Sequence, residues 1–130
     1  KEKMKTRTAA RALIENEDKI LFSKCQDSKG VFYVLPGGKI ESKELAEEAL
    51  IRECMEETGY SVLVEELVLV KEFIKKIPDV PAFKDGIHQI ELIFKCKLDK
   101  SKVKLEAKAM DVYQVSLEWL PINSLSNLKI

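Results

Sequence analysis

The chain has 130 residues, 45% of them apolar, so it can bury one core and is expected to form a single domain over residues 1–130. Lysine and arginine together number 22, as do aspartate and glutamate, so the formal charge is zero and no broad basic field exists to hold duplex nucleic acid. Cys25, Cys54 and Cys96 lack a CxxC spacing, which favours reduced thiols in the cytoplasm, and no apolar stretch approaches the roughly 20 residues of a membrane span.

The first third of the sequence predicts three strands. Residues 8–14 and 19–24 are short apolar runs separated by a polar cluster at 15–18, a pattern that predicts an antiparallel hairpin. A loop is predicted at 26–30. Residues 31–35 are rich in β-branched and aromatic side chains and predict a third strand.

A glycine pair and a helix follow. Gly37 and Gly38 have no Cβ, so the backbone can turn sharply there and approach a ligand closely. Ser42 is the predicted N-cap of the helix, and Glu44 suits the first turn through the helix dipole. Gly59 is placed to end the helix in a left-handed conformation.

The second half predicts further strands. Residues 61–74 read as one strand, or as two strands with a bend, and residues 75–86 contain proline and glycine among charges, which predicts an exposed loop. Residues 88–98 alternate as a strand, and residues 112–117 predict the last one. Pro121 can start a short helix.

Three glutamates share one face of the predicted helix. Glu53, Glu56 and Glu57 stand at i, i+3 and i+4, so at about 100° per residue their side chains converge. Ala49 and Leu50 lie one turn back on the same face, which is therefore expected to point into the protein. Like charges about 4 Å apart repel by roughly 4 kcal/mol even at an effective dielectric near 20. A divalent cation would remove this repulsion, so the pattern predicts a metal site.

The run from residue 38 to residue 60 resembles the Nudix box, the signature of the Nudix hydrolase family. The residues that match its fixed positions are Gly38, Glu44, Arg52, Glu53, Glu56, Glu57 and Gly59. Cys54 stands where an aliphatic residue is usual, and Tyr60 takes a second such position. Weaker matches lie outside the box, at residues 35–41, Arg11 and residues 119–121.

The resemblance implies an α/β fold, described as an α/β/α sandwich around a mixed β-sheet. It also implies a Mg²⁺-dependent enzyme, with Mn²⁺ as the alternative metal. In the family this helix binds metal ions that bridge a diphosphate and activate water. Carried over residue by residue, the resemblance assigns metal ligation to three carboxylates and one backbone carbonyl: Glu53, Glu56, Glu57 and Gly37.

The resemblance also implies roles for polar residues around these glutamates. Arg52 lies four residues before Glu56, within reach of an ion pair that would fix the rotamer of that carboxylate. The family pattern pairs Glu44 with such an arginine and so holds the loop against the helix. The general base is left open between Glu53 and Glu91. Glu91 lies opposite the apolar set of its strand, and the alternative is that it is plain surface charge.

The expected substrate is a small nucleotide, with Arg11, Gly37 and Gly38 as its implied contacts. The leading hypothesis is hydrolysis of a nucleoside diphosphate linked to another group, and the small size of the chain favours a nucleoside triphosphate. ADP-ribose or a sugar nucleotide is the alternative substrate. A catalytically inactive Nudix-fold sensor is a second class of function, and the intact carboxylates argue against it. A homodimer is left open.

Overall fold

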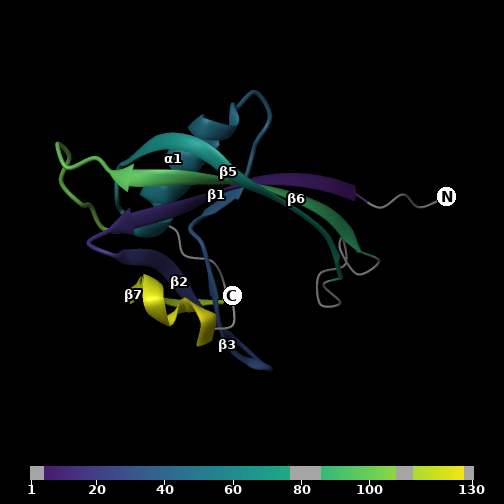
Figure 1. Ribbon diagram of the computed structural model, residues 1–130. Coiled ribbons are helices and arrows are strands. Elements are labelled where there is room, and N and C mark those ends of the chain that lie inside the picture. The colour runs from purple at the N-terminus through teal and green to yellow at the C-terminus, as the bar shows by residue number, and fades with distance from the viewer. Residues whose placement is uncertain (1–4, 77–85, 108–112, 128–130) are drawn as a thin grey trace.

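The computed structural model describes residues 5–76, 86–107 and 113–127 (Figure 1). The predicted loop at 75–86 falls mostly outside these ranges, as does the first residue of the strand predicted at 112–117. In chain order the described elements are β1 (Lys5–Asn16), β2 (Lys19–Asp27), β3 (Gly30–Val34), β4 (Gly37–Lys39), α1 (Ala46–Thr58), β5 (Val62–Lys75), β6 (Ile87–Leu98), β7 (Gln114–Pro121) and the 3₁₀ helix η2 (Ile122–Asn127).

The described strands form one mixed sheet. Its order is β3-β2-β1-β6-β5, with β4 added to β1 and β7 added to β2. β1 and β6 run parallel, and the other pairs are antiparallel. The predicted α/β class with a mixed sheet is therefore confirmed. β1 and β2 pair beside their turn, where Glu15 faces Ile20 and Asn16 faces Lys19, and the two strands then diverge (Figure 1). This divergence separates β5, β6, β1 and β4 from β2, β3 and β7.

The predicted hairpin at residues 15–18 is confirmed. Glu17 and Asp18 have φ angles of 52° and 62°, the left-handed conformation that a tight two-residue hairpin turn requires. The loop predicted at 26–30 is wrong, because β2 continues to Asp27 and pairs with β3 from Gly30. Polar side chains on these exposed strand ends gave the pattern of a loop although their backbone is paired.

The start of the helix differs from the prediction. α1 begins at Ala46, so the N-cap predicted at Ser42 is wrong. Lys43 has a φ of 68°, which lies outside the helical region and separates Ser42 from the helix. The first turn is instead capped by Glu48, whose Oε1 accepts the N–H of Leu45 at 2.8 Å. Glu44 therefore precedes the first turn and is available for other partners.

The end and the buried face of α1 follow the prediction. Gly59 has a φ of 77° and its N–H donates to the carbonyl of Met55 at 3.0 Å, which closes the helix in the left-handed conformation. Ala49 and Leu50 are fully buried. Leu50 belongs to a core cluster made of Ala10, Ala12, Ile14, Leu21, Leu50, Cys54, Val62, Phe94 and Cys96.

The bounds of β5 and β6 lie within one residue of the prediction, whereas β7 ends four residues later than predicted. β5 is one strand, so of the two alternatives the single strand is the correct one, and its register against β6 shifts twice. β7 extends to Pro121 because it pairs with β2 as far as Lys19, and the helix predicted from Pro121 is the 3₁₀ helix η2. In the described part of the chain, no helix combines the length and apolarity needed to cross a membrane. No disulfide joins the three cysteines, and all three are buried.

Candidate functional site

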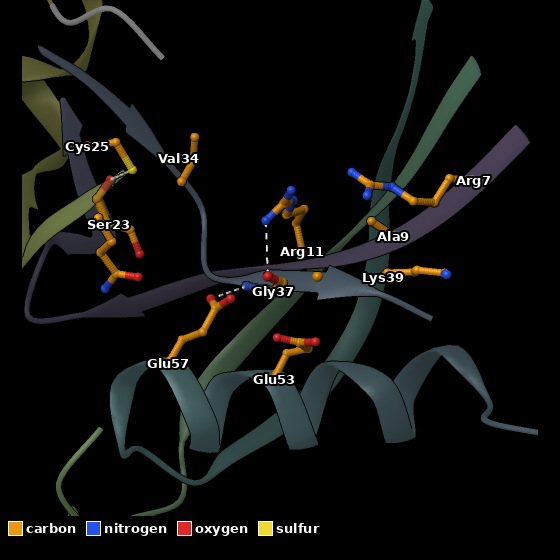
Figure 2. Close-up of a pocket in the computed structure, with 12 residues that line it drawn as sticks. Arg7, Ala9, Arg11, Ser23, Cys25, Val34, Gly37, Lys39, Glu53 and Glu57 are labelled. Atoms are coloured by element: carbon orange, nitrogen blue, oxygen red, sulfur yellow. Dashed lines mark hydrogen bonds between the residues drawn. The ribbon is translucent and has the colours of Figure 1, made fainter. Parts of the chain in front are cut away.

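A cavity of about 210 Å³ lies where the two parts of the sheet diverge, above α1 (Figure 2). We call it the site cavity. Its walls come from β1, β2, β3, β4, β7 and α1. Glu53 and Glu57 reach it from α1, and the basic side chains of Arg7, Arg11 and Lys39 reach it from β1 and β4. Carboxylates and cationic groups therefore face one small space, which can accept both a cation and the anionic oxygens that a cation would bind.

The glycine pair forms part of a strand instead of the sharp turn that was predicted. Gly37 and Gly38 belong to β4, with Gly38 opposite Ala10 of β1. Gly37 has a φ of 139°, and a Cβ there would collide with the carbonyl oxygen of Ala10. A Cβ on Gly38 would lie 2.7 Å from Cδ of Glu53. Glycine at these two positions therefore lets β4 fit between β1 and the carboxylate of Glu53.

Glu57 is fixed by the same strand. Its Oε1 accepts the backbone N–H of Gly37 at 3.1 Å. Burial raises the pKa of Glu57 to about 7; the negative charge of Glu53 adds to the shift, while the Gly37 N–H and the charge of Arg11 oppose it. A bound cation would favour the charged form of this buried carboxylate and so oppose the shift.

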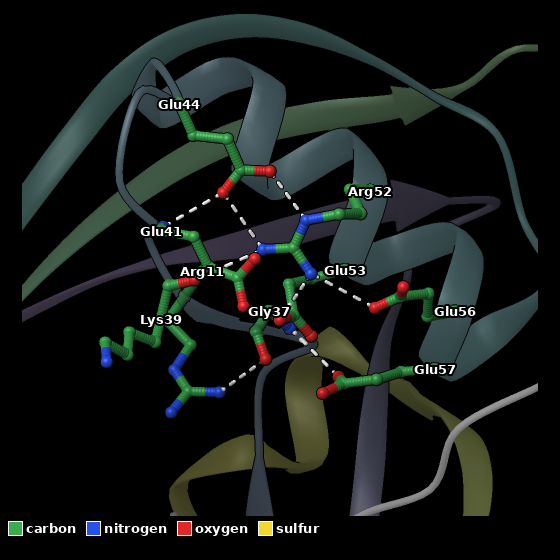
Figure 3. Close-up of polar contacts among 9 residues, drawn as sticks. All are labelled: Arg11, Gly37, Lys39, Glu41, Glu44, Arg52, Glu53, Glu56 and Glu57. Carbon is green, nitrogen blue, oxygen red and sulfur yellow. Dashed lines mark hydrogen bonds and ion pairs between the residues drawn. The ribbon is translucent and has the colours of Figure 1, made fainter.

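Arg52 ties the loop before α1 to the glutamates of the helix (Figure 3). Its Nε and Nη2 donate to the two oxygens of Glu44 at 2.6 and 3.0 Å, a bidentate pair. Its Nη1 donates to Glu53 at 3.0 Å and to Glu56 at 3.1 Å. The predicted Arg52–Glu56 ion pair and the predicted pairing with Glu44 are both present. The hydrogen bond from Arg52, helped by the N–H of Glu41, lowers the pKa of Glu44 to about 2.

The three predicted metal ligands are not all in one place. Within the described ranges, no group of three or more His, Cys, Asp or Glu side chains is arranged to hold a metal ion. Glu53 and Glu57 line the site cavity, whereas Glu56 does not and its carboxylate accepts a hydrogen bond from Arg52. Two carboxylates still fit Mg²⁺, which is commonly bound by one or two carboxylates and completes its shell with water and phosphate oxygens.

Arg11, which lines the site cavity, forms a partly buried ion pair with Glu91. Nε of Arg11 lies 3.2 Å from Oε2 of Glu91, and Nη1 donates to the carbonyl oxygen of Gly37 at 3.1 Å. Glu91 is only 8% exposed, so its interpretation as surface charge is wrong. β6 is paired along both edges, with β1 and with β5, and the carboxylate of Glu91 contacts the side chains of Arg11 and Gln89. The Gly37 carbonyl, predicted to assist a metal, is held by Arg11.

The Arg11–Glu91 pair belongs to a longer network across the parallel strands β1 and β6. Gln89 donates to Glu91 through Nε2 at 3.0 Å, and its Oε1 accepts from Nε of Arg7 at 2.9 Å. Arg7 and Arg11 thus lie on one face of β1 and are aligned by partners on β6. Sequence reasoning did not single out Arg7 or Gln89, although Arg7 and Arg11 are four residues apart and so share one face of a strand.

Two further residues of the site cavity were also missed. Ser23 lies on β2 and Gln114 is the first residue of β7, and both line the cavity. Each is a single uncharged side chain in a strand, which gives no motif. Lys39, on β4, falls within the weaker match at residues 35–41 and lines the cavity beside Gly38.

Comparison with known proteins agrees with this arrangement. The family model described as the NUDIX domain matches residues 5–130. A nucleoside triphosphatase, NudI, of Escherichia coli O139:H28 is 35% identical over 120 residues, which cover 88% of this chain and 85% of the relative.

Solved structures share the fold. A NUDIX hydrolase from Nitrosomonas europaea aligns with a TM-score of 0.71 at 22% identity and covers 95% of this chain and 78% of that one. A MutT NUDIX hydrolase from Burkholderia pseudomallei aligns with the same TM-score and identity and covers 92% of this chain and 85% of its own.

Proposed function

The chain belongs to the Nudix hydrolase family, and from that premise we propose that it hydrolyses a diphosphate bond of a nucleoside triphosphate in the site cavity. The observation that carries the proposal is the meeting of Glu53 and Glu57 with Arg7, Arg11 and Lys39 around one cavity. The similarity to a protein named as a nucleoside triphosphatase supports this substrate class over ADP-ribose or a sugar nucleotide.

The metal in this proposal is Mg²⁺, with Mn²⁺ as the alternative. Glu53 and Glu57 would hold it, and Glu56 would join them if its ion pair with Arg52 opened. When bound, the ion would neutralise diphosphate charge and lower the pKa of a bound water. The donor set supports a hard cation because all the ligands are oxygen atoms.

The basic side chains have a separate role. Arg7, Arg11 and Lys39 would bind the phosphate oxygens, and Gly37 and Gly38 would let the phosphates approach the backbone of β4. Arg11 is already oriented by Glu91 and by the Gly37 carbonyl, so little side-chain entropy would be lost on binding.

Arg52 and Glu44 would act as positioning residues. Arg52 holds Glu53 through Nη1 and is itself held by both oxygens of Glu44. Of the two candidates for the general base, we favour Glu53. Glu91 is less suited because its Oε2 already accepts hydrogen bonds from both Arg11 and Gln89. We therefore place Glu91 among the positioning residues, acting through Arg11.

A substrate screen tests the proposed function. The purified protein would be given nucleoside triphosphates, ADP-ribose, sugar nucleotides and dinucleoside polyphosphates, each with Mg²⁺, with Mn²⁺ and with EDTA. We expect metal-dependent release of phosphate or pyrophosphate from triphosphates. Cleavage of ADP-ribose or a sugar nucleotide in preference to triphosphates would replace the substrate class. Binding of nucleotides without cleavage of any substrate would identify the sensor instead.

We also propose that the protein forms a homodimer through β5. This strand lies at an edge of the sheet, and six of its apolar side chains are between 42% and 63% exposed. They are Leu63, Leu67, Val68, Leu69, Val70 and Ile74. An exposed apolar edge strand can pair with a second strand and bury these side chains, and a second copy supplies the same self-complementary surface.

The proposed compartment is the cytoplasm. The support is the state of the cysteines, which are buried and form no disulfide in the described residues. Burial raises the pKa of Cys96 to about 12, so this thiol stays protonated and unreactive.

A further inference from the structure

Two buried polar atoms in the site cavity have no hydrogen-bond partner. They are Oγ of Ser23 and Nε2 of Gln114, and no other buried side-chain nitrogen or oxygen in the described residues is left in this way. Ser23 is 2% exposed, so water does not reach it freely. A buried donor or acceptor without a partner costs about 1–3 kcal/mol. Both residues line the cavity that holds Glu53 and Glu57, so a ligand in that cavity can supply the missing partners.

Ser23 lies on β2, two residues before Cys25, and Gln114 on β7 is opposite Cys25, so both belong to one end of the site cavity. Figure 2 shows Ser23, Cys25 and Val34 on one side and Arg7 and Lys39 on the other. We call the first side, together with Gln114, the neutral end, and the second side the charged end. Glu57 and Gly37 lie between the two ends. One ligand that spans the cavity would therefore meet charge at one end and uncharged polar groups at the other.

A β-bulge brings Gln114 to the neutral end. Ser23 is opposite Leu117 and Lys24 is opposite Ser116, so a regular register would place Val115 opposite Cys25. The register shifts between Lys24 and Cys25, and Gln114 takes that position instead. Since Ser23 and Cys25 share one face of β2, the shift puts the carboxamide on the face of Ser23.

We propose that Ser23 and Gln114 bind the base of the nucleotide whose phosphates meet the charged end. This inference rests on the proposed function. A carboxamide presents a donor and an acceptor side by side, and a hydroxyl can do either. The edge of a nucleobase presents the same neutral groups, whereas a phosphate or carboxylate would leave its charge unpaired at the neutral end.

The chemistry also predicts discrimination among bases. A site built to hydrogen-bond a substrate group rejects an analogue that lacks it, because the buried polar groups of the site are then unpaired. Ser23 and Gln114 are therefore specificity-determining residues that do not contact the reacting phosphorus. Their loss should raise KM for the preferred base and leave kcat nearly unchanged.

The test compares Ser23→Ala, Gln114→Leu and the wild type. We would measure kcat and KM for the four ribonucleoside and four deoxyribonucleoside triphosphates, with inorganic triphosphate as a probe that has no base. The wild type should show unequal kcat/KM among the bases. In each variant, the ratio of kcat/KM between the best and the worst base should fall about tenfold, through a change in KM. Each variant should cleave inorganic triphosphate as the wild type does.

Control variants separate this effect from damage to the strands. Ser116→Ala changes the same residue type on β7, opposite Lys24, and Gln26→Ala removes an exposed glutamine from β2. Both should leave the base ratios unchanged. Gln114→Glu keeps the size of the side chain but replaces the donor with an acceptor, so it should change the order of base preference and not merely flatten it.

The outcomes distinguish this inference from the proposed function. A wild type that cleaves no nucleotide overturns the proposed function. A wild type that cleaves all bases equally, or variants that retain its base ratios, overturns the base assignment alone. If kcat/KM of a variant falls by the same factor for inorganic triphosphate as for nucleotides, the residue has a structural role. This result would also overturn the assignment.

Discussion

The carboxylate of Glu57 accepts a hydrogen bond from the backbone N–H of Gly37, at 3.1 Å and across 20 residues of sequence. On the opposite side of the same peptide segment, Arg11 donates to the Gly37 carbonyl at 3.1 Å. β4 is therefore held between α1 and β1, and the position of one proposed metal ligand is set by a strand and not by its helix alone.

Neutralising Glu57 should abolish most metal-dependent turnover. Glu57→Gln keeps the size of the side chain and can still accept the Gly37 N–H, but it removes one of the two carboxylates that line the cavity. We expect kcat to fall at least about a hundredfold and calorimetric Mg²⁺ binding to weaken. Glu47→Gln, an exposed change on the same helix, is the control. Equal turnover in both variants would disprove the assignment of Glu57 as a ligand.

Without metal, stability should fall as the pH rises through the range set by Glu57. Its pKa is raised from an ordinary value of 4.5 to about 7 in the folded protein. The folded state binds the Glu57 proton more tightly than the unfolded state does. The resulting stabilisation of the folded state is full below about pH 4.5 and is lost as the pH rises through 7. In EDTA at pH 8, the free energy of unfolding of Glu57→Gln should exceed that of the wild type by on the order of 2 kcal/mol. Urea titrations at pH 4 and pH 8 measure this difference, which should vanish at pH 4.

The Arg52–Glu44 pair has the opposite pH dependence. The folded-state pKa of Glu44 is lowered to about 2 from its ordinary value of 4.5. Its contribution is therefore present above about 4.5 and lost as the pH falls toward 2. Glu44→Gln should flatten the acid limb of a Tm-versus-pH curve, and an unchanged acid limb would contradict the pairing.

Arg52→Lys tests positioning by the same pair. Lysine keeps the charge but cannot make the bidentate contact with Glu44, so we expect kcat/KM to fall about tenfold or more. The double variant with Glu44→Gln should lose little beyond either single one, since both changes release Glu53. Additive losses in the full cycle would show that the two residues act independently.

The two glycines of β4 should respond differently to alanine. Gly38→Ala would press on the carboxylate of Glu53, whose side chain can move aside, so the fold should survive with a higher Mg²⁺ requirement. Gly37→Ala would collide with the backbone of Ala10 at a positive φ, so it should lower Tm. Thermal melts and Mg²⁺ titrations of turnover separate the two effects, and a reversed pattern would contradict the packing described here.

A charge on β5 should prevent association. Leu69 and Val70 are 52% and 53% exposed on neighbouring positions of the edge strand, so their side chains point to opposite faces. Leu69→Arg and Val70→Arg together should shift sedimentation from dimer to monomer. Val103→Arg, at a position that is 81% exposed outside β5, is the control. A wild type that sediments as a monomer at high concentration would rule out the dimer.

The local features were predictable because neighbours in the sequence produce them. The 15–18 hairpin, the left-handed Gly59 and the i, i+3, i+4 spacing of the glutamates depend on backbone geometry within a few residues. The start of α1 was mispredicted at Ser42 because serine is a favoured N-cap residue, whereas the first turn is capped by Glu48.

The sequence by itself therefore determined the family, the α/β class and the helix that carries the glutamates. The tertiary structure decided which of these glutamates face the cavity, since β4 packs over Glu53 and Glu57, and it decided the burial of Glu91, whose carboxylate contacts Arg11 and Gln89. It also brought Ser23 and Gln114 into one space. Their contact with a common cavity depends on the pairing and bulge of β2 with β7, and strand pairing between distant segments leaves no periodic signal in either segment alone.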